Sequence, residues 1–109
     1  MSWHFRSVKG NPRGEEFTLQ ALPFLIGRGS DCHLRALSSE VSRHHCTLVE
    51  WNGHLYVQDC SSRNGTFING ERVDSAAELK EHDLLKVGPL VFEVIYEESE
   101  SRELELAGV

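Results

Sequence analysis

Three short polar segments of the sequence combine residue types that could bind an anion. They are the segments 27–31 (Gly-Arg-Gly-Ser-Asp), 40–45 (Glu-Val-Ser-Arg-His-His) and 59–66 (Asp-Cys-Ser-Ser-Arg-Asn-Gly-Thr). Between them they offer three guanidinium groups, a hydroxyl and an amide, on Arg28, Arg43, Arg63, Ser42 and Asn64. A phosphate group carries a charge of about −1.5 to −2 and three acceptor oxygens, so it would use more of these donors than a carboxylate would. The segments therefore predict a phosphate-binding site.

The residues between these segments predict short strands. Apolar and polar residues alternate over 16–21, as they do in a half-buried strand, and Asn52-Gly53 is a strong hairpin signal. Further apolar stretches lie at 3–8, 24–26, 46–51, 55–59, 67–68, 84–87 and 90–96. A helix-like window at 75–81 is too short and uncapped to predict a helix. Many short strands punctuated by Gly, Asn and Pro predict an all-β sandwich or barrel, with the three polar segments gathered at one end of it.

Four motifs, taken in order, resemble the signature of forkhead-associated (FHA) domains. They are Gly27-Arg28, Ser42-Arg43-His44-His45, Ser62-Arg63-Asn64-Gly65-Thr66 and Asn69-Gly70, within a match from about Phe24 to Phe92. The resemblance implies an FHA/SMAD-like β-sandwich of about eleven strands with ligand-binding loops at one end. It also implies recognition of phosphothreonine in an extended peptide of a partner protein.

The resemblance assigns expected roles to individual residues. Arg28 and Ser42 are expected to bind the phosphate, with Arg43 and Arg63 as further donors, and Asn64 to hydrogen-bond the peptide backbone on both sides of the phosphothreonine. An architectural role is implied for Gly27, His45, Gly65, Asn69 and Gly70, with His45 bracing the loops.

One further position concerns specificity. Glu40 stands where some FHA domains read the residue three after the phosphothreonine. An acidic side chain there is expected to repel Asp and to favour Lys or Arg in the peptide.

The charge of the chain is concentrated at its end. The formal net charge of the 109 residues is −6, and residues 97–109 hold five glutamates and one arginine, which leaves −2 for residues 1–96. This balance argues against non-specific binding of nucleic acid. We expect residues 1–96 to form one FHA domain and residues 97–109 to form an acidic, flexible tail or linker.

Several other classes of function are disfavoured. The chain has three cysteines, no apolar leader and no apolar run long enough for a membrane span, which favours a cytoplasmic protein with free thiols. The Cys32-His33 and His44-His45-Cys46 groups fit no common zinc spacing, so we expect no metal or cofactor. A Ser42/His45/Asp59 triad lacks the Gly-x-Ser-x-Gly motif, so we expect neither an enzyme nor a small-molecule substrate.

Two functions remain after these exclusions. The first is a phosphothreonine-dependent adaptor in Ser/Thr kinase signalling. The second is a phospho-independent FHA-like interaction or dimerisation domain that uses a sheet face. Partner binding that survives the loss of Arg28 and Ser42 would favour the second.

Overall fold

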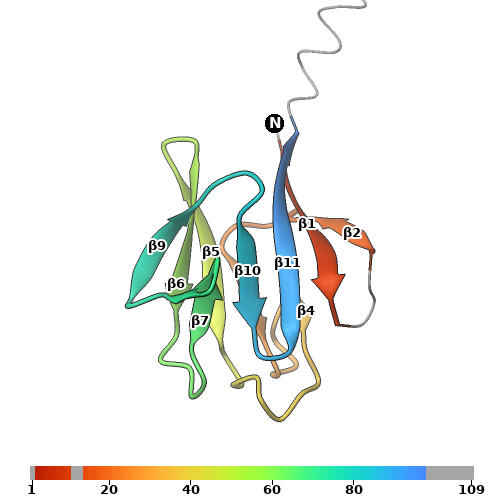
Figure 1. Ribbon diagram of the computed structural model, residues 1–109, viewed down its shortest axis with the longest axis vertical. Coiled ribbons are helices and arrows are strands. Elements are labelled where there is room, and N and C mark those ends of the chain that lie inside the picture. Colours follow the sequence, from red (N-terminus) through yellow and green to blue (C-terminus); the bar gives the residue numbers. More distant parts are fainter. Residues whose placement is uncertain (1, 11–13, 98–109) are drawn as a thin grey trace, which may run out of the picture.

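Two β-sheets pack face to face in the computed structural model, which describes residues 2–10 and 14–97 (Figure 1). These residues form eleven strands. One sheet has six strands in the order β2-β1-β11-β10-β7-β8, and the other has five in the order β4-β3-β5-β6-β9. The strands are β1 (Ser2–Lys9), β2 (Glu16–Thr18), β3 (Phe24–Gly27), β4 (Leu34–Arg35), β5 (Cys46–Trp51), β6 (His54–Asp59), β7 (Thr66–Ile68), β8 (Glu71–Arg72), β9 (Ala76–Leu79), β10 (Leu84–Val87) and β11 (Leu90–Glu97). The prediction of an all-β sandwich is confirmed.

The core lies between the sheets and is built from alternate residues of each strand. The rings of Phe5 and Phe92 stack with centroids 5.4 Å apart, and Phe17 packs edge-on against both. From the other sheet, Ile26, Leu48, Leu55 and Val57 are fully buried. Burial of this apolar surface is the main stabilising term for a domain of this size, so the sandwich can act as a rigid support for its loops.

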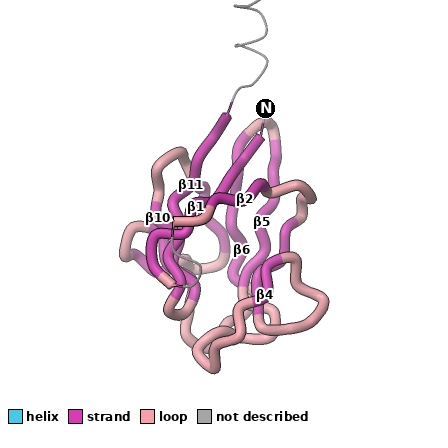
Figure 2. The backbone as a smooth tube through the Cα atoms, turned by 90° about the vertical axis from the view of Figure 1, so that its right-hand side faces the viewer, coloured by secondary structure: helices cyan, strands magenta, loops and turns pink. Residues whose placement is uncertain are grey.

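The three polar segments lie at one end of the sandwich. In Figure 1 the loops β3–β4, β4–β5 and β6–β7 lie at the lower end, opposite the β5–β6 hairpin and the N-terminus, and Figure 2 shows the same arrangement from the side. The register supports this view, because β3, β5 and β6 are neighbours and Cys46 pairs with both Ile26 and Asp59. Strand ends that lead into the three loops are therefore adjacent in space.

Three details of the fold differ from the sequence expectations or extend them. The strand expected over 16–21 ends at Thr18, although the backbone N–H of Leu19 still bonds to the carbonyl of Trp3. Residues 76–79, inside the helix-like window, form β9 as an edge strand beside β6. β11 runs to Glu97, and the rest of the expected tail lies outside the described residues. Within the described ranges no helix is long and apolar enough to cross a membrane.

Candidate phosphate-binding site

The five residues expected to contact a phosphopeptide line one small pocket. Its volume is about 150 Å³, and Arg28, Ser42, Arg43, Arg63 and Asn64 surround it together with Ser39, Glu40 and Val41. The pocket is polar and open to solvent at the loop end. The structure thus brings together side chains from three loops that span 37 positions of the sequence.

Arg28 is positioned by backbone pairing beyond the end of β3. Its N–H donates to the carbonyl of Ser42 at 3.0 Å, and the next N–H, of Gly29, donates to the carbonyl of Arg43 at 3.0 Å. The Arg28 side chain donates from Nε to the carbonyl of Val41 at 3.1 Å. Its terminal Nη groups have no acceptor among the described residues, so they can donate to a ligand.

Gly27 is required by the close approach of two backbones. A Cβ atom at this position would overlap the carbonyl oxygen of Arg43 and lie 2.9 Å from the carbonyl carbon of that residue. Since Gly27 has no positive φ, its small size matters and not its conformational freedom. This contact sets the spacing between the β3 end and the loop that carries Ser42 and Arg43.

His45 links the β4–β5 loop to the β6–β7 loop and is fully buried. The backbone N–H of Ser42 donates to its Nδ1 at 3.0 Å, and its Nε2 lies 2.8 Å from the carbonyl of Gly65. These partners require a neutral ring protonated on Nε2. Neither ring nitrogen bonds to the Ser42 hydroxyl, which accepts instead from the N–H of Arg63 at 2.9 Å, so Ser42, His45 and Asp59 do not form a catalytic triad.

The β6–β7 loop is held in place by Asp59, the last residue of β6. The carboxylate of this residue accepts hydrogen bonds from the hydroxyl and N–H of Ser62 and from the hydroxyl of Thr66. Partial burial raises the pKa of Asp59, but the hydrogen bonds from Ser62 and Thr66 outweigh it and hold the pKa below its usual value. The Ser62 hydroxyl also accepts from the N–H of Gly65 at 3.1 Å. This bracing by Asp59 and Ser62 was not predicted from the sequence.

Asn64 is placed at the rim of the pocket by one side-chain hydrogen bond. Its Nδ2 donates to the carbonyl of Glu40 at 2.8 Å, which leaves its Oδ1 without a partner among the described residues. Asn64 has no positive φ, whereas Gly65 has a φ of 90°. The turn geometry is thus supplied by the glycine, and Asn64 contributes its side chain to the rim.

Asn69 and Gly70 form the β7–β8 turn, with φ values of 51° and 85°. The Asn69 side chain accepts from the N–H of Leu84 at 2.9 Å and donates to Asp83 at 3.0 Å. These bonds attach the turn to the start of β10. The pair does not line the small pocket.

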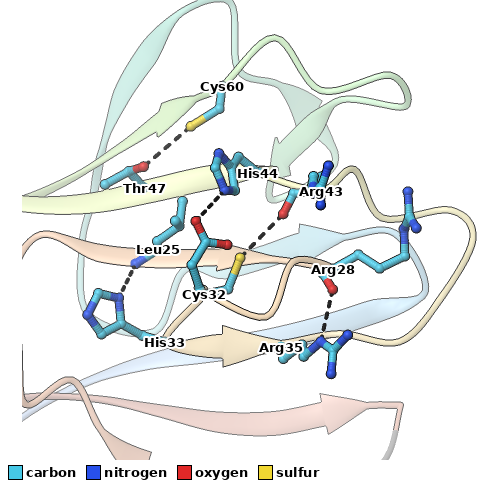
Figure 3. A network of polar contacts seen from close by, with 10 residues as sticks. Leu25, Arg28, Cys32, His33, Arg35, Arg43, His44, Thr47 and Cys60 are labelled. Atoms are coloured by element: carbon cyan, nitrogen blue, oxygen red, sulfur yellow. Dashed lines mark hydrogen bonds and ion pairs between the residues drawn. The ribbon is translucent and has the colours of Figure 1, made fainter.

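A larger polar pocket of about 660 Å³ adjoins the small one and was not predicted from the sequence. It shares Arg28, Arg43 and Arg63 with the small pocket and adds Arg35, on β4. The Nε of Arg35 donates to the carbonyl of Arg28 at 3.0 Å (Figure 3). The available signal was a fourth arginine between residues 28 and 63, but β4 has only two residues and left no pattern that would place it.

Three potential metal ligands also lie together near the β3–β4 loop. One ligand atom each from Asp31, Cys32 and His44 lies within 4.8 Å of the others, with His44 bonded to Asp31 at 2.8 Å (Figure 3). The His44 hydrogen bond is the main cause that lowers the pKa of Asp31. A metal ion would have to replace this bond and the one from the Cys32 thiol to the Arg43 carbonyl.

Of the residues considered for zinc from the sequence, the fold brings Cys32 and His44 together but leaves His33 and Cys46 outside this group. His33 accepts from the N–H of Leu25 at 2.9 Å and stacks on Phe24, away from His45. Cys46 is buried in the core, and this burial raises the pKa of its thiol far above the usual range. His33 and Cys46 are therefore each occupied by contacts of their own.

Comparison with known proteins agrees with this geometry. The family model described as FHA domain matches residues 24–88. The chain is 44% identical over 63 residues to the ABC transporter ATP-binding/permease protein Rv1747 of Mycobacterium tuberculosis, 58% of this chain and 7% of that protein. It is 30% identical over 87 residues to the FHA domain-containing protein FhaB of Mycolicibacterium smegmatis, 80% of this chain and 56% of that protein. The chain thus spans only part of each of these relatives.

Solved structures show the same fold. Mycobacterium tuberculosis EmbR in complex with a low affinity phosphopeptide superposes with a TM-score of 0.79 and 28% identity, over 86% of this chain and 24% of that chain. The FhaA FHA domain complexed with the intracellular domain of Rv3910 gives a TM-score of 0.75 and 26% identity, over 85% and 99%. FHA domains are non-catalytic modules of a phosphothreonine-binding family. With three of its four motifs at one end of a two-sheet sandwich and the fourth in the β7–β8 turn, this chain belongs to the FHA domain family.

Proposed function

We propose that this FHA domain binds phosphothreonine in an extended segment of a partner protein and acts as an adaptor in Ser/Thr kinase signalling in the cytoplasm. The observation that carries the proposal is the small pocket in which Arg28, Ser42, Arg43 and Arg63 converge. Similar proteins support it, because the EmbR structure contains a phosphopeptide. In this function no covalent bond is made or broken.

The electrostatics of the pocket favour a dianion. None of its three arginines forms an ion pair with a carboxylate among the described residues, and all three are exposed. Charge-assisted hydrogen bonds contribute about 1.5–3 kcal/mol each. Two or three of them therefore make the affinity for a phosphorylated peptide orders of magnitude higher than the affinity for its unphosphorylated form. We expect the affinity to be about micromolar, near −8 kcal/mol.

Asn64 and Glu40 are proposed to act on the peptide around the phosphothreonine. The free Oδ1 of Asn64 and its second N–H are suited to pair with the two peptide groups that flank the phosphorylated residue. The Glu40 side chain is exposed beside the same pocket and has no ion-pair partner within the described ranges. It would therefore disfavour Asp and favour Lys or Arg three residues after the phosphothreonine, and a peptide library that selects Asp at this position would refute that role.

The experiment compares matched peptides that differ only in the phosphate. Isothermal titration of threonine, phosphothreonine and phosphoserine versions should give measurable binding only with phosphate. Arg43→Ala is a suitable variant, because the Arg43 side chain donates no hydrogen bond to a described residue and its loss should leave the fold intact. Lys80→Ala serves as the control, because it removes the same charge from the opposite end of the sandwich. Lys80 follows Leu79, which pairs with Leu55.

The results separate the two functions considered from the sequence. Loss of binding in Arg43→Ala and Arg28→Ala, with Lys80→Ala unchanged, supports the phosphothreonine site. Equal affinity for the phosphorylated and unphosphorylated peptides would overturn it. Partner binding or dimerisation that survives both arginine substitutions would favour the phospho-independent interaction domain.

A further inference from the structure

The larger polar pocket holds more positive charge than one phosphate can neutralise. Arg28, Arg35, Arg43 and Arg63 line it, and no acidic residue does. A phosphate bound in the small pocket would bring a charge of about −1.5 to −2. Glu40, which lines only the small pocket, offsets part of the positive charge there. The part of the pocket beside Arg35 would remain cationic with a phosphothreonine in place.

The described residues provide no carboxylate partner for these arginines. The ion pairs among the described residues involve Arg6 and four histidines, and none involves the four arginines of the pocket. Asp31 is a nearby acid whose pKa is lowered mainly by its hydrogen bond with His44 and only to a lesser degree by the charge of Arg43, and it does not line the pocket. An external anion is therefore the natural partner for the remaining charge.

Arg35 is held in place for such a partner. β4 pairs in parallel with β3, which sets Gly27 opposite Arg35, and the Nε–H of Arg35 is fixed on the carbonyl of Arg28. This leaves the Nη groups of Arg35 without an acceptor among the described residues. Figure 3 shows Arg28, Arg35 and Arg43 at the same end of these strands. One anchored nitrogen reduces the rotamer freedom that the side chain would lose on binding a ligand.

Hydroxyl groups complete the donor set. Ser30 and Ser38 line the larger pocket and not the small one. The Ser38 hydroxyl accepts from the N–H of Glu40 at 3.1 Å, so its own proton is free to be donated. Guanidinium and hydroxyl donors around an open, polar space of about 660 Å³ match an anionic side chain, whether phosphate or carboxylate.

We infer that the larger pocket is a subsite for a second anionic side chain of the same phosphopeptide, contacted by Arg35. The inference rests on the proposed phosphothreonine site, because the two pockets share three arginines. Since those shared residues place the pockets side by side and an extended chain advances about 3.3–3.6 Å per residue, the second anion lies within about four residues of the phosphothreonine. The second anion lies on the side of the phosphate that faces away from Asn64, because Asn64 lines the small pocket and not the larger one.

The test is a scan of a second charge along a phosphothreonine peptide. A parent peptide with neutral flanks is compared with peptides carrying one phosphoserine, one glutamate or one alanine at each of the flanking positions, up to about four residues on either side. Titrations use the parent protein, Arg35→Ala, Arg35→Lys and the distant control Lys80→Ala. We expect phosphoserine at one or two positions on one side to raise affinity about tenfold, or about 1.4 kcal/mol, and glutamate to raise it less.

The variants assign the gain to Arg35. Arg35→Ala should remove the gain and change the affinity for the singly phosphorylated peptide by less than about twofold, while Arg35→Lys retains part of the gain. A scan without any gain, or a gain that Arg35→Ala leaves intact, would overturn the subsite alone. So would an Arg35→Ala variant that weakens both peptides equally, which would assign Arg35 to the first phosphate. A parent protein that binds none of the peptides would overturn the proposed function itself.

Discussion

The hydroxyl of Ser42 accepts a hydrogen bond from the backbone N–H of Arg63 at 2.9 Å, across 21 positions of the chain. This bond fixes the distance between two loops that each supply an arginine to the small pocket. Because the hydroxyl uses a lone pair for Arg63, its proton remains available to a phosphate oxygen. Ser42 thus both sets the shape of the pocket and offers a donor to the ligand.

Substitution of Ser42 separates these contributions. Ser42→Ala should weaken binding of a phosphothreonine peptide about tenfold or more, because one hydrogen bond to a charged group contributes about 1.5–3 kcal/mol. Ser42→Thr keeps the hydroxyl and should lose much less. Titration calorimetry gives the affinities, and amide exchange at Arg63 reports whether the loop has loosened. Equal weakening by both substitutions would show that the side chain acts through shape and not through its hydroxyl.

Removal of the His45 side chain should destabilise the whole domain. His45→Ala would leave the partly buried N–H of Ser42 and the buried carbonyl of Gly65 unpaired and would open a cavity, at a cost of about 2–4 kcal/mol. Urea denaturation measures the free energy of unfolding. The control is His54→Ala, which removes an imidazole that is 58% exposed at the other end of the sandwich and should cost little. Similar losses in both variants would contradict the bracing role of His45.

The sequence predicted the class of fold because the strands that build the core have clear patterns. Strands such as β1, β5 and β11 show alternation over six to eight residues, and Asn-Gly pairs mark two of the turns. β4 and β8 have two residues each, too few for any periodicity. β9 is defined by its pairing with β6, and such long-range pairing outweighs local preference.

The site residues that belong to a recognisable sequence motif could be predicted, whereas isolated residues outside such a motif could not. Arg28, Ser42, Arg43, Arg63 and Asn64 were expected together, and the structure gathers all five around one pocket. Arg35 was missed because its position depends on β4 pairing in parallel with β3. The bracing bonds of Asp59 were missed because the sequence of a strand end does not show which loop groups its last carboxylate will bond.

The stability of the domain should fall in acid partly through Asp59. Because the pKa of Asp59 is lowered in the folded protein, its ionised form contributes stability that is fully present above the unfolded-chain pKa of about 3.9. This contribution is lost as the pH falls through the lower pKa of the folded state. Asp59→Asn should therefore reduce stability at pH 7, and the difference from the parent should shrink on acidification.

Urea denaturation between about pH 7 and pH 2.5 tests this prediction. The control is Glu71→Gln, which neutralises an exposed acid on β8 that forms no hydrogen bond with another described side chain. The parent and Glu71→Gln should show the same dependence on pH. A difference between the parent and Asp59→Asn that stays constant across the range would show that the hydrogen bonds to Ser62 and Thr66 do not depend on ionisation of the carboxyl.

Gly27 and Gly29 should respond differently to the addition of a methyl group. A Cβ at Gly27 would overlap the backbone carbonyl of Arg43, which can move only if β3 separates from the β4–β5 loop. A Cβ at Gly29 would meet the carboxylate of Asp31 at 2.7 Å, and this side chain can rotate away. Neither glycine has a positive φ, so the comparison isolates packing from backbone strain.

Gly27→Ala should therefore lower the free energy of unfolding by about 1–3 kcal/mol and Gly29→Ala by less. Separation of the loop would also move Arg28 away from Ser42 and Arg43, so Gly27→Ala should weaken phosphopeptide binding more than its loss of stability alone explains. Titrations at a temperature where both variants are fully folded provide the measurement. Gly27→Ala with the parent's affinity under these conditions would show that the pocket tolerates a shift between β3 and the loop, and that the spacing set by Gly27 is not what positions the phosphate donors.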